Sequence, residues 1–121
     1  MKTASRVLLA LAGLYGAAGV ALAAASAHLG GPNLATAAQI LLFHAPALVG
    51  IAVAAELTAL PRRLVLAAGA AIALGAFAFS GTLAAGALAN WRPVPMGAPT
   101  GGFLMIGGWL LLAGAAAFGR R

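Results

Sequence analysis

The side chains of this chain that can do chemistry are few, and they are scattered along an otherwise apolar sequence. Imidazole and carboxylate groups take up and release protons, whereas hydroxyl and indole groups form hydrogen bonds. The candidates are His28, His44, Glu56, Ser80, Thr82, Thr100 and Trp109. They contain no evident pair of acid and base, or of nucleophile and base, which catalysis requires. The sequence therefore predicts a non-enzymatic protein without catalytic residues.

His44 is the sharpest of these candidates, because an imidazole inside an apolar segment is costly without a partner or a water-filled cavity. Pro46 follows two residues later and frees the carbonyl of Leu42, so we expect a kink and a polar notch beside the ring. The ring can donate to Ser80, to Thr82 or to a carbonyl and so hold helices together. Alternatively, it binds a ligand or handles a proton, which requires water or a nearby acid.

Glu56 is the only acidic residue of the chain. In small four-helix multidrug exporters an embedded glutamate exchanges protons for cations, and Glu56 is a candidate for the same role. Its position, about one turn from the end of an apolar segment and close to Arg62 and Arg63, favours an ion pair instead. His44 and Glu56 are the two groups that a proton-coupled protein would titrate.

The composition places these residues in a membrane protein. Of 121 residues, 64% are hydrophobic and 7% are charged, far from the averages of soluble domains. Apolar segments cover residues 7–27, 35–57, 64–88 and 100–118, and each is long enough to cross a bilayer. Because lipid cannot satisfy backbone polar groups, these segments must be helices. We expect an all-α fold, a single integral membrane four-helix bundle over residues 1–121.

The basic residues indicate how this bundle lies in the membrane. The net charge of +6 comes from residues at the ends of the apolar segments, which indicates topology and not nucleic-acid binding. One side holds Lys2, Arg6, Arg62, Arg63, Arg120 and Arg121. Only Arg92 lies on the other side, with Trp91 as an interfacial anchor. The positive-inside rule predicts cytoplasmic N and C termini and a multi-pass protein of the inner (plasma) membrane.

Glycine and proline punctuate the connections between the segments. They are Gly30, Gly31 and Pro32, with Asn33, then Pro61, then Pro93, Pro95, Gly97 and Pro99. Thr100 is predicted to cap the fourth helix, where free amides also suit an anion or a lipid headgroup. The first segment has the basic start and Ala-rich end of a cleavable signal peptide, but its length favours a helix that stays in the membrane.

Small residues dominate all four segments, and in lipid they let helices approach closely. The candidate contact points are Gly13, Gly16, Ala17, Gly75, Gly107, Gly108 and Gly114. They could serve contacts within the bundle or between the subunits of a homo-oligomer.

Three polar residues fall at a similar depth in their segments. His44, Ser80 and Trp109 are about eight or nine residues from the outer end, or roughly 12 to 14 Å at 1.5 Å per residue. Nearer the outer surface lie His28, Thr82 and Thr100. The outer half of the bundle is therefore predicted to hold a polar pocket, suited to a lipid or a quinone-like ligand.

No cofactor and no metal are predicted. His28 and His44 differ by more than two turns in depth, so one haem iron would struggle to meet both. Methionine, histidine and acidic residues are too few for a dedicated metal site. The absence of cysteine excludes disulfides and thiolate chemistry.

Short motifs in a fixed order carry a resemblance to a known family. They are Ser26-Ala27-His28-Leu29, Phe43-His44-Ala45, Phe79-Ser80-Gly81-Thr82-Leu83, Ala98-Pro99-Thr100-Gly101-Gly102 and Gly107-Gly108-Trp109. Their order and spacing resemble the Domain of Unknown Function 423 family, small four-helix membrane proteins related to the eukaryotic transmembrane protein 256. The resemblance spans nearly the whole chain. It implies the fold, the membrane location and matching polar positions at His28, His44, Ser80, Thr82 and Trp109, but no activity.

The chain departs from the family pattern at several positions. Ser26 stands where Gly is usual, Pro46 where Leu is usual and Ala84 where Tyr is usual. The Pro and Thr of the fourth motif appear in inverted order, as Pro99-Thr100. Loss of the Tyr hydroxyl speaks against a mechanism that depends on it.

Two functional hypotheses follow. The first is a non-enzymatic interaction protein or a small-ligand or lipid-binding protein, in which His44 and Ser80 contact the ligand or brace the bundle. The alternative is a minimal proton-coupled transporter of small molecules that acts as an oligomer, because four helices rarely enclose a pathway alone.

Overall fold

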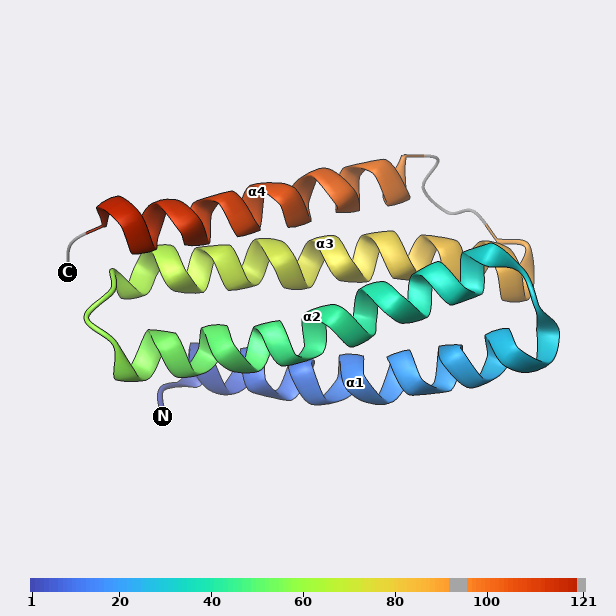
Figure 1. Ribbon diagram of the computed structural model, residues 1–121, viewed down its shortest axis with the longest axis horizontal. Helices are drawn as coiled ribbons and strands as arrows, with labels where there is room; N and C mark the ends of the chain where they lie inside the picture. Colours follow the sequence, from blue (N-terminus) through green and yellow to red (C-terminus); the bar gives the residue numbers. More distant parts are fainter. Residues whose placement is uncertain (92–95, 120–121) are drawn as a thin grey trace.

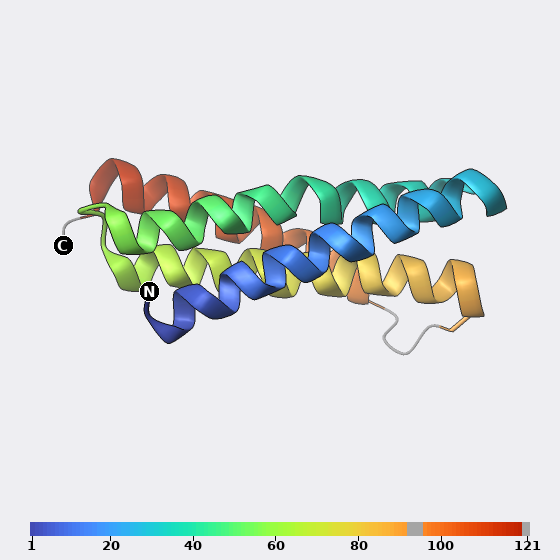
Figure 2. The ribbon, with the colours of Figure 1, turned by 90° about the horizontal axis from the view of Figure 1, so that it is seen from below.

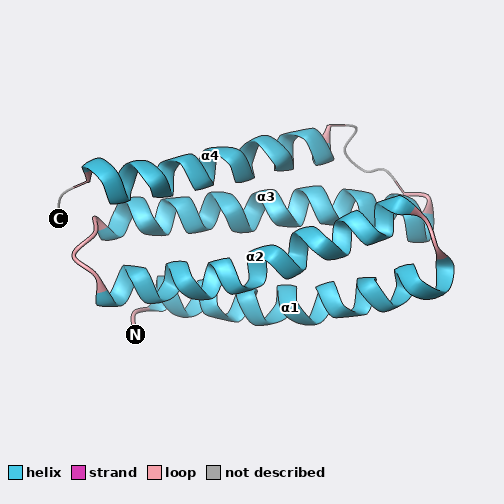
Figure 3. Cartoon of the chain, in the orientation of Figure 1, coloured by secondary structure: helices cyan, strands magenta, loops and turns pink. Residues whose placement is uncertain are grey.

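The computed structural model describes residues 1–91 and 96–119, which form four antiparallel helices (Figure 1). The helices are α1 (Thr3–Leu29), α2 (Pro32–Leu57), α3 (Arg62–Ala89) and α4 (Gly97–Phe118). No strand occurs in these ranges (Figure 3). All four helices are long and apolar enough to cross a bilayer. The predicted all-α fold with four membrane-spanning helices is confirmed.

The start of α1 and the end of α4 lie at the same end of the bundle (Figure 1). We call this end the basic end, because Lys2, Arg6, Arg62 and Arg63 lie there, and the other end the opposite end. Arg92, Pro93 and Pro95 of the third connection lie outside the described residues, as do Arg120 and Arg121.

Each helix is delimited by residues that suit a helix end. Gly30 and Gly31 link α1 to α2 with positive φ angles of 74° and 95°, which glycine adopts without strain. Pro32 then occupies the first turn of α2, where its missing amide costs nothing. Asn90 ends α3 in the left-handed conformation, and the amide of Trp91 donates to the carbonyl of Ala85.

The start of α4 differs from the prediction. The helix begins at Gly97, and the amide of Thr100 already donates to the carbonyl of Met96 over 3.0 Å. Pro99 fits there because amides of the first turn have no intrahelical acceptor. The prediction that Thr100 caps this helix is therefore wrong.

The core lies between α2 and α3 and is built largely from small side chains. Leu48, Val65 and Ile72 are fully buried in it. α1 packs along α2, and α4 packs along α3. Figure 2 shows α1 running obliquely across α2 and α3, and it approaches α3 much less than it approaches α2. Among the pairs of helices that pack along each other, α1 and α3 therefore have the loosest contact.

Glycine sets the close approach of α3 and α4. A Cβ atom added to Gly101 would lie 2.5 Å from the carbonyl oxygen of Gly75, and one added to Gly108 would lie 2.9 Å from that of Ala68. The predicted close contacts at Gly75 and Gly108 are confirmed.

The other predicted contact points are not close approaches between helices. Gly16 would make an ordinary contact of 3.8 Å with Ala45, and Ala17 is exposed. A Cβ atom at Gly13, Gly107 or Gly114 would meet no atom of another element within 4 Å. Contacts of these residues in a homo-oligomer stay a prediction.

Candidate functional site

His44 lies in the middle of α2 and is 8% exposed. Its Nδ1 atom is 2.7 Å from the carbonyl oxygen of Ile40, and its Nε2 atom is 3.1 Å from the indole Nε1 of Trp109. An indole N–H can only donate and a carbonyl can only accept. The ring is therefore neutral, with its proton on Nδ1, and both nitrogens are engaged.

Trp109 reaches this partner from α4. Its ring centroid lies 5.9 Å from that of His44, with 58° between the ring planes, and the side chain is 42% exposed. Since α4 packs along α3, the indole bond is a direct link from α4 to α2. His44 thus braces two helices, as one of the two interpretations expected, although its acceptor is a carbonyl of its own helix.

Pro46 lies two residues after His44 in α2. Without an amide, Pro46 cannot donate to the carbonyl of Leu42. The ribbon of α2 bends near its middle (Figure 1), in keeping with the expected kink.

Ser80 belongs to a different part of the bundle. It is 1% exposed, and its hydroxyl donates to the carbonyl of Ala37 over 3.0 Å, which links α3 to α2. Its bond therefore goes to the backbone of α2 and not to His44. The three residues expected at one depth are split between a His44–Trp109 pair and a separate Ser80 contact.

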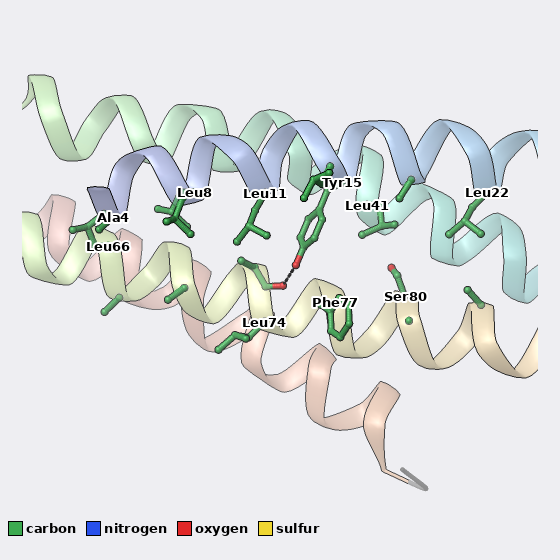
Figure 4. A pocket seen from close by; sticks show the side chains of 18 residues that line it. Ala4, Leu8, Leu11, Tyr15, Leu22, Leu41, Leu66, Leu74, Phe77 and Ser80 are labelled. Atoms are coloured by element: carbon green, nitrogen blue, oxygen red, sulfur yellow. Dashed lines mark hydrogen bonds between the residues drawn. The ribbon is translucent and has the colours of Figure 1, made fainter. Parts of the chain in front are cut away.

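Ser80 also lines a groove of about 1000 Å³ between α1 and α3, which we call the α1–α3 groove. Apart from Ser80 and Tyr15, its walls are apolar (Figure 4). The labelled residues are Ala4, Leu8, Leu11, Tyr15, Leu22, Leu41, Leu66, Leu74, Phe77 and Ser80. Several wall side chains, among them Leu14, Leu74 and Phe77, are 63–67% exposed, so the groove opens along the side of the bundle.

Tyr15 crosses this groove and was not singled out from the sequence. Its hydroxyl donates to the carbonyl of Ala73 over 2.5 Å, and the side chain is 8% exposed (Figure 4). It is the only tyrosine of the chain. A phenol in the middle of an apolar helix requires an acceptor from a neighbouring helix. The position of Tyr15 in its apolar segment therefore could have indicated a contact between helices.

At the basic end, polar groups tie three helices together. The Glu56 carboxylate accepts a hydrogen bond from the backbone amide of Lys2 over 3.1 Å and pairs with Arg62 over 3.4 Å. Arg62 also donates to the hydroxyl of Ser5, which is fully buried. The expected ion pair of Glu56 is confirmed, and its partner is Arg62.

The remaining candidates lie away from His44. His28 is exposed in the last turn of α1. Thr82 lies against Gly97 at the start of α4, and Thr100 is exposed on the first turns of that helix. The structure does not bring His28 or Thr100 to His44.

Among residues 1–91 and 96–119 there is no group of three or more His, Cys, Asp or Glu side chains able to hold a metal ion. The arrangement offers hydrogen bonds between helices and a long apolar groove. His44 and Glu56, the two groups that a proton-coupled transporter would titrate, both already have hydrogen-bond partners. The transporter hypothesis stays a prediction.

These features define a multi-pass membrane protein of four helices, braced by isolated hydrogen bonds and grooved along one side. Residues 12–102 match the sequence profile of a family described as "Protein of unknown function (DUF423)", and the chain belongs to this family. The matched range includes His28, His44, Ser80, Thr82 and Thr100 and ends before Trp109. No curated protein and no solved structure matches the chain.

Proposed function

We propose that this protein is a non-enzymatic lipid-binding protein of the inner membrane, which holds one hydrocarbon chain of a lipid in the α1–α3 groove. The observation that carries the proposal is the shape and lining of that groove. Its volume of about 1000 Å³ is at the upper end of the range typical of ligand pockets, about 300–1,000 Å³.

The groove is suited to an extended ligand. Its α1 wall runs from Ala4 to Leu22, which at 1.5 Å per residue is about 27 Å. The hydrocarbon core of a bilayer is about 30 Å thick. A chain lying in the groove would therefore stay at the depth where acyl chains already lie.

The polar atoms of the groove favour a hydrocarbon chain over a quinone head. A quinone carbonyl needs a donor, and the hydroxyl protons of Tyr15 and Ser80 are directed to backbone carbonyls. What the walls offer instead is methyl and aromatic surface. Dispersion contacts with such surface suit an acyl or isoprenoid chain.

The orientation in the membrane is part of the proposal. The basic end carries Lys2, Arg6, Arg62 and Arg63, and cytoplasmic loops are the ones enriched in Lys and Arg. We therefore place the basic end on the cytoplasmic side.

Native mass spectrometry of protein released gently from membranes tests lipid binding. We expect one lipid per chain in the wild type and loss of this lipid in Ala18→Phe, because Ala18 lines the groove and a phenyl ring there would obstruct the path of an extended chain. The matched control is Ala17→Phe, since Ala17 is an exposed neighbour on the same helix that does not line the groove. A wild type without a retained lipid, or equal retention in both variants, would contradict the proposal.

A further inference from the structure

One helical turn beyond the groove, at the basic end, the groove-lining face of α3 carries a cation. On α3 the residues at positions 63, 67, 70, 74, 77, 81 and 84 alternate in spacing between four and three, so they share one face of the helix. From Ala67 to Ala84 all of these residues line the groove. Arg63 continues the same face by one further turn, at the basic end, and is exposed.

The neighbouring cations are placed differently. Arg62 is bonded to Glu56 and to Ser5, and Glu56 is the only acidic side chain of the sequence. Arg6 lines a separate small hollow with Met1, Leu9 and Ala10. Within the described ranges, Arg63 is thus the cation that continues the groove-lining face of α3.

We propose that the α1–α3 groove selects an anionic phospholipid, with its phosphate at Arg63 and one acyl chain extending along the groove past Tyr15 to the level of Ala18. This inference rests on the proposed function. A guanidinium group matches a phosphate with two parallel hydrogen bonds, and its charge does not depend on pH in the physiological range. The headgroup of a lipid whose chain lies between α1 and α3 at the basic end would lie at the level of Arg63.

Charge decides between the lipids that a membrane offers. Phosphatidylglycerol carries a net negative charge, whereas the choline group of phosphatidylcholine cancels the phosphate charge. A basic residue near an anionic membrane surface contributes about 1 kcal/mol, or about fivefold in affinity, and we expect a similar contribution from a contact between Arg63 and one lipid phosphate. The expected preference is therefore modest, and it depends on one residue.

The test is a native mass spectrometry titration of the full chain in micelles, with phosphatidylglycerol and phosphatidylcholine of identical acyl chains. We expect the wild type to prefer phosphatidylglycerol. Arg63→Gln should reduce this preference by about fivefold while phosphatidylcholine binding stays unchanged. Arg6→Gln, which removes an equal charge away from the groove, should keep the preference.

The outcomes separate this inference from the proposed function. If Arg63→Gln keeps the preference, or if Arg6→Gln lowers it equally, selection by Arg63 is wrong, although lipid binding in the groove can still hold. If Ala18→Phe binds both lipids as the wild type does, the groove is not the binding site and both proposals fail.

Discussion

The bond between Trp109 and His44 joins helices that otherwise meet through α3. In the membrane, water cannot replace either partner, so an unpaired indole N–H or imidazole nitrogen would stay unsatisfied or seek another helix. Both ring nitrogens of His44 have partners, so the ring orientation is fixed and the His44–Trp109 bond holds α2 and α4 together. Protonation of Nε2 would place two donors face to face.

We predict that Trp109→Phe and His44→Ala each destabilise the bundle and that their effects are coupled. Hydrogen bonds between membrane helices have coupling free energies that average about 0.6 kcal/mol and reach about 1.7 kcal/mol. A double-mutant cycle, measured by circular dichroism during unfolding in mixed micelles, should give a value in this range.

Trp91→Phe provides the control for this cycle. Trp91 is 62% exposed and lies beyond the end of α3, so the substitution should leave the free energy of unfolding nearly unchanged. Strictly additive effects of Trp109→Phe and His44→Ala would show that the bond does not stabilise the bundle.

The depth of these residues could be predicted from the sequence, but their partners could not. Counting along the segments placed His44 and Trp109 at one level, and the bond between them agrees with this. Which way each side chain points depends on the rotation of its helix. Because the surrounding lipid is as apolar as the core, an Ala-rich helix has no polar face to mark its outside. For Ser80 the predicted depth is wrong, because its partner Ala37 lies about two turns of α2 away from His44. The contact of Tyr15 could not be predicted because it too depends on the rotation of its helix.

The contact between α3 and α4 depends on backbone approach. At Gly101, an added Cβ would meet the carbonyl oxygen of Gly75 at 2.5 Å and the amide nitrogen of Phe79 at 2.6 Å. Both are backbone atoms, so they cannot be moved aside by changing a rotamer. At Gly107, on the same helix, an added Cβ would meet no atom of another element within 4 Å.

We predict that Gly101→Ala costs about 1–3 kcal/mol of stability, the usual cost of overpacking. Gly107→Ala should be neutral or stabilising by up to about 1 kcal/mol, because alanine is the better helix former. Thermal unfolding of both variants in the same detergent compares them directly. Equal losses would mean that the close approach at Gly101 is not what holds α4 to α3.

Whether a helix existed was easier to predict than where it began. The four apolar runs indicated four spans, and each observed helix extends beyond its run. The extensions at the basic end include polar residues such as Ser5 and Arg62, which stay helical because they bond to neighbouring elements. The proline that suggested a late start of α4 is tolerated in the first turn. Hydropathy cannot report either effect.

The proposed orientation of the whole bundle predicts which of its two ends can be labelled from outside the cell. The chain has no cysteine, so a single introduced cysteine is the only thiol. Asn33→Cys, at the opposite end, should react with a membrane-impermeant maleimide added outside the inner membrane. Ala59→Cys, at the basic end, should react only after lysis.

The reverse pattern would contradict the proposed orientation. Labelling of both cysteines from one side would contradict the placement of the two ends on opposite faces of the membrane. Both positions are exposed on the bundle, so failure to react cannot be attributed to burial within the protein.

The oblique course of α1 ties the groove to the thickness of the surrounding bilayer. α1 and α3, with 27 and 28 residues, extend about 40 Å at 1.5 Å per residue, whereas a typical hydrocarbon core measures about 30 Å. Helices longer than the bilayer adapt by tilting. Because α1 is only loosely held to α3, a thinner membrane would change the angle between them first. Acyl-chain length would then regulate the width of the groove, and through it the lipid that the protein retains.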